Sequence, residues 1–273
     1  MTDAPADAAL LATLERYYDA APRPTARTEA IGPFTLFVAE RGWPFYARPA
    51  LARAERITVD DVLRVLGRQR QLAVPQQLEW VHDVTPSLDP AARAAGLHVQ
   101  RCPLLVLGEL RPPRPPEGTS VRMLDADDPE LPQVRAAIAV GFDYQGTERG
   151  DVSAAERDHF AETNDTSLSQ VGADLMSRGL LAIAGAFDDT GATAGGSHSP
   201  RGDVTEVTGV AVLPAARRRG IGAAVTAALA GDARSRGVAT VFCSAQSDDV
   251  ARIYVGVGFR RVGTACIVQH SGT

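Results

Sequence analysis

Apolar and polar positions in the second half of the chain alternate between runs of strand length and runs of helical period. Apolar runs predict strands over Ser120–Leu124, Leu180–Phe187, Ala192–His198, Val204–Leu213, Val238–Ser244 and Gly263–Gln269. Helical spacing predicts helices over Asp128–Val140, Ala154–Asn164, Leu168–Arg178, Gly220–Arg236 and Asp248–Val257, the first with Asp128 as its N-cap. This alternation predicts an α/β (α+β) fold, with a mixed sheet flanked by helices.

A proline-rich stretch divides the chain. Residues 111–118 contain four prolines, which favour a stiff spacer over a helix or a central strand. We therefore expect a smaller N-terminal α/β domain over 1–110 and a second domain over 119–273.

One matched spacing suggests that the first domain partly copies the second. Trp80 lies in a predicted strand, Gln77–Val81, and Gly96 follows sixteen residues later; Gly258 follows Phe242 at the same distance. An apolar strand comes next in both places, at Pro103–Leu107 and at Thr264–Val268. A partial, degenerate duplication and two unrelated domains both remain open.

Composition narrows the class of protein. The net charge of −5 and the pI near 5.6 argue against non-specific binding of nucleic acid. No run of 18 apolar residues predicts a membrane span, and the first residues do not resemble a signal peptide, so we expect a cytoplasmic protein. The three cysteines, Cys102, Cys243 and Cys266, lack metal-type spacing, and those in apolar runs favour small buried thiols.

The chemistry concentrates at one turn. Arg217, Arg218 and Arg219 precede Gly220 and Gly222 at the predicted start of a helix. Cations there oppose the helix dipole by roughly 0.3–1 kcal/mol each, whereas a bound anion would turn that cost into attraction. Glycine lets the backbone approach the anion closely. A phosphate-bearing ligand is therefore the first hypothesis, and a solvated arginine cluster is the alternative.

Two familiar phosphate loops do not fit this turn. A P-loop needs a lysine, and the chain contains none, since all 28 of its basic residues are arginine. A dinucleotide fingerprint needs glycine or alanine three residues after Gly222, where this chain has Val225.

The turn fits the pattern Arg-x-x-Gly-x-Gly, through Arg217, Gly220 and Gly222. A Val-x-Val-x-Pro strand end precedes it over 210–214, and Ile253-Tyr254-x-x-x-Gly258-Phe259 follows. Together these features resemble the GCN5-related N-acetyltransferases (the GNAT family) over about residues 119–269. The resemblance implies a GNAT-like, mostly antiparallel sheet, acetyl-CoA as co-substrate, and direct transfer of an acetyl group to a primary amine. The spacing of the cysteines and histidines suggests no metal site.

The resemblance also implies how acetyl-CoA would bind. The pantetheine arm would pair with the backbone of the strand before the loop, as an added strand does, and the pyrophosphate would lie on the following turn. The residues that it assigns to cofactor binding are Val210, Ala211, Val212, Arg217, Arg218, Arg219, Gly220, Ile221, Gly222 and Ala223.

Two catalytic residues follow from the same likeness. Glu206 lies four residues before Val210, the separation that these enzymes often use for a general base, and period two places both on one strand face. Tyr254 would protonate the departing thiolate. A structural ion pair for Glu206 and a packing role for Tyr254 are the alternatives. The family's asparagine near this last helix is replaced by Ser247-Asp248-Asp249, which favours an N-cap.

Other candidates are weaker. His198 could replace Glu206 as the base or line the site, although a loop histidine is more often structural. Four histidines show no ligand spacing: His82, His98, His159 and His270. The aromatic residues Trp43, Phe45, Tyr46 and Trp80 could form one wall of the acceptor site or pack in a core.

The acceptor is the open question. We expect a small-molecule amine as the partner and neither nucleic acid nor membrane, and we leave a homodimer open. Acidic residues that could bind a cationic amine, or form a solvated helix face, are Asp143, Glu148, Asp151, Glu156, Asp158, Glu162 and Asp165. The competing functions are a non-catalytic acyl-CoA sensor and a scaffold for another phosphorylated ligand.

Overall fold

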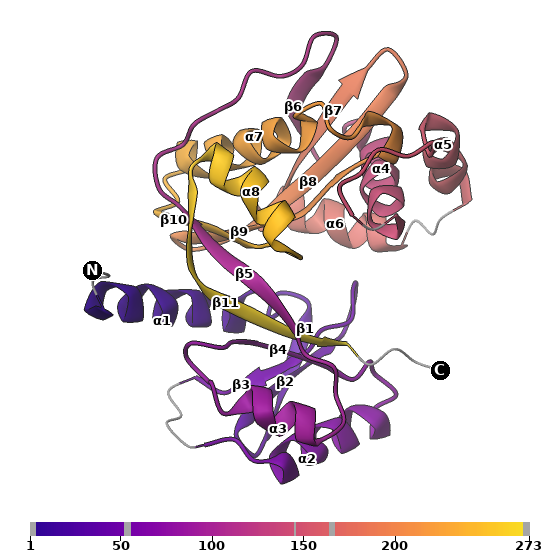
Figure 1. Ribbon diagram of the computed structural model, residues 1–273. Helices are drawn as coiled ribbons and strands as arrows, with labels where there is room; N and C mark the ends of the chain where they lie inside the picture. The colour runs from indigo at the N-terminus through magenta and orange to yellow at the C-terminus, as the bar shows by residue number, and fades with distance from the viewer. Residues whose placement is uncertain (1–3, 52–55, 145, 164–166, 270–273) are drawn as a thin grey trace. The chain divides into compact units, whose positions relative to one another are not determined.

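The computed structural model describes residues 4–51, 56–144, 146–163 and 167–269. They form two compact units (Figure 1). Unit 1 comprises Met1–Leu104, Ser244–Gln246 and Arg261–Thr273, and unit 2 comprises Leu105–Cys243 and Ser247–Arg260. Asp165 and His270 lie outside the described residues.

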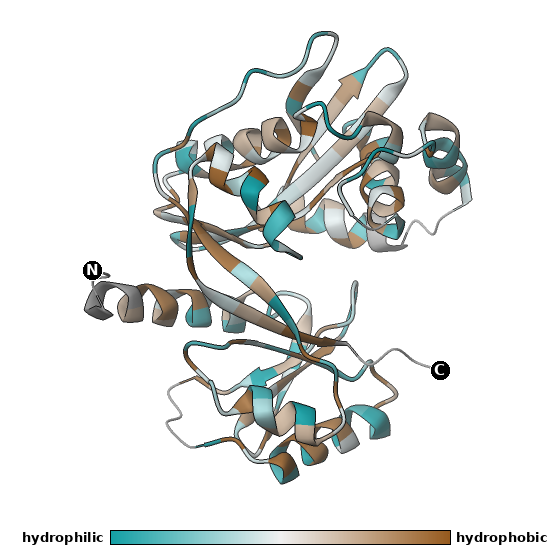
Figure 2. Ribbon diagram, in the orientation of Figure 1, coloured by the Kyte–Doolittle hydropathy of each residue, from teal (hydrophilic) through white to brown (hydrophobic). Residues whose placement is uncertain are grey.

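Unit 1 packs helices against a small sheet. Its elements are α1 (Ala4–Ala20), β1 (Ala26–Ile31), β2 (Phe34–Ala39), β3 (Ala47–Pro49), α2 (Val59–Gln71), β4 (Gln77–Val81) and α3 (Leu88–Ala94). Strand β11 (Phe259–Gln269) pairs antiparallel with β4, with Cys266 opposite Trp80. Hydrophobic and hydrophilic residues alternate along α2 (Figure 2), and its apolar stripe, including Val62 and Val65, is buried in the same core as Trp80.

Unit 2 also combines strands with helices. Its elements are β6 (Ser120–Leu124), α4 (Leu131–Asp143), α5 (Ala154–Thr163), α6 (Ser167–Ser177), β7 (Ala182–Asp188), β8 (Gly191–Arg201), β9 (Val204–Val212), η1 (Pro214–Ala216), α7 (Ile221–Ser235), β10 (Thr240–Ser244) and α8 (Asp248–Val257). Strand β5 (Gln100–Leu107) begins in unit 1 and ends in unit 2. Strands β6 to β9 pair antiparallel in sequence, whereas β9 pairs parallel with β10.

The strands follow the order β1-β2-β3-β4-β11-β5-β10-β9-β8-β7-β6 in one sheet. The predicted mixed, mostly antiparallel sheet flanked by helices is confirmed. The element order α1-β1-β2-β3-α2-β4-α3-β5 is repeated by α6-β7-β8-β9-α7-β10-α8-β11. Gly96 and Gly258 follow the equivalent helices α3 and α8, both with positive φ. In this repeat α2 is the counterpart of α7.

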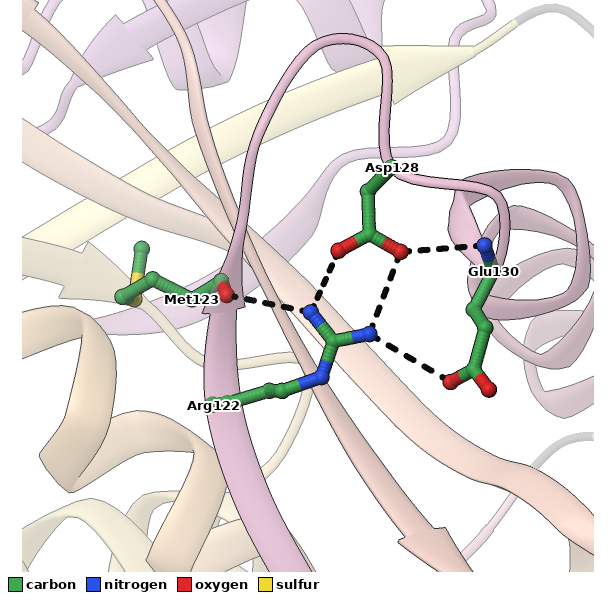
Figure 3. A network of polar contacts seen from close by, with 4 residues as sticks. All are labelled: Arg122, Met123, Asp128 and Glu130. Carbon is green, nitrogen blue, oxygen red and sulfur yellow. Dashed lines mark hydrogen bonds and ion pairs between the residues drawn. The ribbon is translucent and has the colours of Figure 1, made fainter.

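The predicted start of the first helix in unit 2 is wrong. Helix α4 begins at Leu131 with Glu130 as its N-cap residue, and no side chain caps it. The Asp128 carboxylate instead accepts hydrogen bonds from the Glu130 backbone N–H, at 3.0 Å, and from the guanidinium of Arg122 on β6 (Figure 3). Asp128 therefore ties the loop to β6, because an aspartate can close a local turn as readily as a helix end.

No helix among the described residues is both long and apolar enough to cross a bilayer.

Candidate functional site

Strand β9 parts from β10 about a third of the way along its length. The parallel register with β10 ends at the pair Glu206 and Phe242, whereas the antiparallel register with β8 continues to Val212. Among the described residues, one edge of β9 beyond Glu206 therefore lacks the strand partner that its first residues have. Such an edge can pair with an extended ligand.

A β-bulge at Gly209 corrects the predicted strand face. Ser197 pairs with Thr208 and Gly195 with Ala211, so that β9 contains one extra residue, and Gly209 has φ +65°. A side chain on Gly196 would lie 2.9 Å from Val210 and 3.1 Å from Leu229 of α7.

Because of this extra residue, the side chains that the sequence places on one face of β9 lie on two different faces, one before the bulge and the other after it. A side chain on Gly195 would meet Val134 and Ile138 of α4. The face of Gly195 and Ser197 therefore lies toward α4, and Thr208 and Glu206 share it, whereas Val210 lies on the α7 side. The expectation that Glu206 and Val210 share one face was wrong, because a bulge reverses the alternation.

The hydrogen bonds between β8 and β9 determine which backbone amides of β9 face its open edge. The Leu213 N–H donates to the Thr193 carbonyl at 2.9 Å, so this pair is hydrogen-bonded to β8. Antiparallel pairs alternate, which makes Ala211 opposite Gly195 the next hydrogen-bonded pair. The Val212 backbone then points away from β8, and its carbonyl accepts from Arg217 Nε at 3.2 Å. The Ala211 amide is therefore hydrogen-bonded within the sheet and does not face the open edge.

The turn after β9 leaves the start of α7 open. Arg218 and Gly220 both have left-handed backbones, with φ of +64° and +85°. Gly220 is the N-cap residue, and no side chain caps the helix. A left-handed arginine costs about 1 kcal/mol or more, and such strain marks candidate ligand sites. The first-turn amides of Ile221, Gly222 and Ala223 are therefore the groups that an anion could reach.

Two of the three arginines already have partners. The Arg217 guanidinium donates to the carbonyls of Gly141 and Tyr144 at the end of α4, which is the helix end that favours a cation. Burial lowers the pKa of Arg217. Arg219 lies 3.6 Å from Asp188, and only Arg218 is exposed with no hydrogen bond or ion pair to any described residue. The electrostatic argument from sequence therefore applies to Arg218 more than to its neighbours.

The counterpart helix α2 shows the opposite arrangement. Thr58 caps it, and Thr58 and Asp61 form a capping box in which the Asp61 carboxylate accepts from the Thr58 N–H at 3.0 Å. Asp60 adds a second negative charge to this first turn. The N-terminus of α2 thus carries its own anions, whereas that of α7 does not.

Glu206 occupies the point where β9 and β10 separate. It is half-buried and lies opposite Ser199 of β8. Beside it Ser197 Oγ lies 3.1 Å from Thr208 Oγ1, on the same side of the sheet. The carboxylate is thus flanked by hydroxyl groups on a partly open surface.

Tyr254 lies within electrostatic reach of Glu206. Its side chain is buried on α8, and its ring makes an edge contact with Phe259 at 5.8 Å between centroids. Burial raises the pKa of Tyr254 well above its usual value, and the charges of Cys243 and Glu206 add to this shift. The phenol therefore stays protonated in the physiological pH range, as a hydrogen-bond donor must.

His198 is a core residue, and it cannot replace Glu206. Its ring is fully buried, with Nε2 2.8 Å from Asp232 Oδ2 on α7 and Nδ1 3.1 Å from Thr205 Oγ1. Burial lowers its pKa despite the opposing effect of Asp232. Because His198 pairs with Val207, it points to the sheet face opposite Glu206.

The remaining candidates divide between structural roles and the surface. Trp80 is buried in the unit 1 core and Trp43 is half exposed. Glu156 accepts from the Ser153 N–H at the start of α5, and Asp158 pairs with the buried Arg157. The other described acidic candidates are exposed: Asp143, Glu148, Asp151 and Glu162. All three cysteines are free and buried.

Sequence reasoning missed two features of this site. The bulge at Gly209 was signalled by a glycine inside a strand, which often marks one. The difference between the capped α2 and the uncapped α7 could be recognised only from the structural repeat, which makes the two helices equivalent. The sequence alone did not show it, because Thr58-x-x-Asp61 has Asp where the usual capping box has Glu or Gln.

Comparison with known proteins agrees with this geometry. Residues 152–259 match the Acetyltransferase (GNAT) family. No curated protein matches the chain.

Solved structures resemble nearly the whole chain. A GCN5-related N-acetyltransferase from Kribbella flavida covers 96% of both chains at 18% identity, with a TM-score of 0.67. One from Sphaerobacter thermophilus covers 87% of this chain and 80% of its own at 17% identity, with a TM-score of 0.54. A tandem GNAT protein of the clavulanic acid biosynthesis pathway covers 92% and 85% at 13% identity, with a TM-score of 0.53. At these identities the likeness is one of fold.

Proposed function

We propose that this chain, whose residues 152–259 match the GNAT acetyltransferase family, transfers an acetyl group from acetyl-CoA to a primary amine of a small molecule. The observation that carries the proposal is the open edge of β9 leading into the uncapped N-terminus of α7. The two features offer, in sequence, an extended partner for pantetheine and free amides for a pyrophosphate.

Acetyl-CoA would lie along this path. The amides of the turn from Arg218 to Ala223 would hold the pyrophosphate, with the exposed Arg218 side chain as the nearby cation. The outward backbone of Val212, and of Val210 across the bulge, would pair with the pantetheine arm. Arg217 would contribute indirectly, because its guanidinium donates to the Val212 carbonyl and so holds this part of the backbone in place.

The reaction needs a neutral amine and a protonated leaving group. Glu206 would accept a proton from the amine, directly or through water, so that the nitrogen attacks the thioester carbonyl. An outward amide of β9 would stabilise the oxyanion of the tetrahedral intermediate. The oxyanion then collapses and the C–S bond breaks, while the nitrogen gives up its second proton to water. Tyr254 would hydrogen-bond the departing thiolate, which takes up a proton from water and leaves as the free thiol of CoA.

The surface around Glu206 favours a hydroxylated acceptor. Ser197, Ser199 and Thr208 surround the carboxylate with groups that donate and accept hydrogen bonds. An amine that carries hydroxyl groups could exchange hydrogen bonds with these side chains, whereas a purely apolar amine could not.

Calorimetry with acetyl-CoA and ADP tests the donor, and an amine panel that reads free thiol tests the transfer. We expect acetyl-CoA to bind more tightly than ADP and at least one hydroxylated amine to release thiol. Equal binding of ADP would favour a scaffold for phosphorylated ligands. Tight acetyl-CoA binding without turnover on any amine would favour a non-catalytic sensor.

Tyr254→Phe should lower kcat about 10- to 100-fold at unchanged affinity for acetyl-CoA, because it keeps the ring packing on Phe259 and loses only the hydrogen bond to the departing thiolate. Since the pKa of Tyr254 is raised, its ionisation should not reduce the wild-type rate up to pH 10. Steady-state rates from pH 6 to 10 check both statements. Equal rates for the wild type and Tyr254→Phe would mean that Tyr254 has only a packing role.

A further inference from the structure

Unit 1 brings together three side chains of metal-ligating type that the acetyl transfer does not use. His82 follows β4, Asp89 lies in the first turn of α3, and Cys266 lies on β11. One ligand atom from each lies within 4.8 Å of the other two. The His82 N–H donates to the Thr264 carbonyl, which extends the β4–β11 register and puts His82 on the same sheet face as Cys266.

His82 offers the clearest sign of a missing partner. Its Nδ1 atom is buried and has no hydrogen-bond partner among the described residues, although a fourth of the side chain is exposed. Asp89 Oδ2 lies 4.0 Å away, which is too long for a hydrogen bond. Two ligands of one tetrahedral zinc ion lie about 3.3–3.8 Å apart, given metal–ligand bonds of about 2.0–2.3 Å. The observed spacing therefore suits a shared ion after a small contraction.

The carboxylate is already oriented. Arg93 Nε donates to Asp89 Oδ1 at 2.6 Å, and this leaves Oδ2 toward His82. Hydrogen bonds of this kind to the second oxygen usually fix a ligating carboxylate. Arg101 Nη1 lies 3.4 Å from Oδ2 and is the competing cation, but nearly half of its side chain is exposed, so it can move away.

We propose that His82, Asp89 and Cys266 form a binding site for a zinc-type divalent cation. A thiolate and an imidazole favour zinc over magnesium or calcium, and the thiolate and carboxylate together balance the charge of the ion. Binding releases the Cys266 thiol proton to solvent as the metal–sulfur bond forms. Water completes the coordination on the exposed side of His82. The ion would fasten β11 to β4 and α3 within unit 1.

Cobalt and zinc titrations of the tag-free, full-length protein test the site. Co²⁺ should produce a sulfur-to-cobalt charge-transfer band at one equivalent, and Zn²⁺ should remove it and raise Tm. Cys266→Ser should abolish the band, and His82→Gln, at a partly exposed position, should weaken zinc binding at least tenfold. Cys243→Ser, a buried cysteine of unit 2, should keep the band.

Arg101→Gln distinguishes the proposed site from non-specific binding of the metal to a thiol, which this substitution would not affect. Removal of the competing cation should strengthen zinc binding several-fold, because Asp89 Oδ2 no longer faces a guanidinium. The proposal is overturned if the wild type shows neither band nor Tm shift, or if the band survives in Cys266→Ser. Weaker binding by Arg101→Gln would also contradict it. Both measurements are independent of acetyl transfer.

Discussion

Ala223→Asp should lower the affinity for acetyl-CoA at least 100-fold while Tm stays unchanged or rises slightly. Ala223 is the third residue of α7, the position that Asp61 occupies in α2. An aspartate in the first turn is favourable to the helix by about 0.3–1 kcal/mol, but it would occupy and charge the site that the pyrophosphate needs. Calorimetry with acetyl-CoA and a thermal melt measure the two effects separately.

The matched control lies in the other half of the repeat. Asp61→Ala should leave the affinity for acetyl-CoA unchanged and destabilise the protein by about 1 kcal/mol, because it breaks the capping box with Thr58. Opposite effects from the two variants would separate a ligand site from a structural cap. If Ala223→Asp binds acetyl-CoA as the wild type does, the pyrophosphate does not lie on α7.

Glu206→Gln should lower kcat about 10²- to 10⁴-fold near neutral pH, with the affinity for acetyl-CoA unchanged. The glutamine keeps the shape and the hydrogen-bonding reach of the side chain but cannot accept the amine proton. The loss should shrink as pH rises toward the pKa of the acceptor amine, since more of the amine is then already neutral. Steady-state rates between pH 6 and 10 measure this convergence.

Glu79→Gln provides the matched control for the same substitution on a strand of unit 1. Burial raises the pKa of Glu79 to about 7, so a neutral side chain suits its environment. We expect wild-type rates from this variant. Unchanged rates in Glu206→Gln would place the general base elsewhere, and a pH-independent loss would indicate a positioning role.

Helices and strands could be predicted from the sequence where the apolar periodicity is strong, and less well where tertiary contacts decide their ends or the direction of their side chains. The predicted range of α8, Asp248–Val257, is confirmed, and Ser247 caps it as expected. Asp128 was misread because its side chain binds Arg122 of a neighbouring strand, a contact that no local pattern contains. The alternation along β9 failed for a similar reason, since one positive φ at Gly209 shifts every later side chain to the other face.

The sequence by itself determined the fold class and the resemblance to the GNAT family, because apolar periodicity and the spacing of Arg217, Gly220 and Gly222 are local properties of the chain. Only the tertiary structure decided what each group faces. It placed Arg217 on the end of α4 and His198 in the core, and it left the amides of α7 uncapped while α2 carries its own carboxylates. These assignments depend on which distant residues meet, and packing alone fixes that.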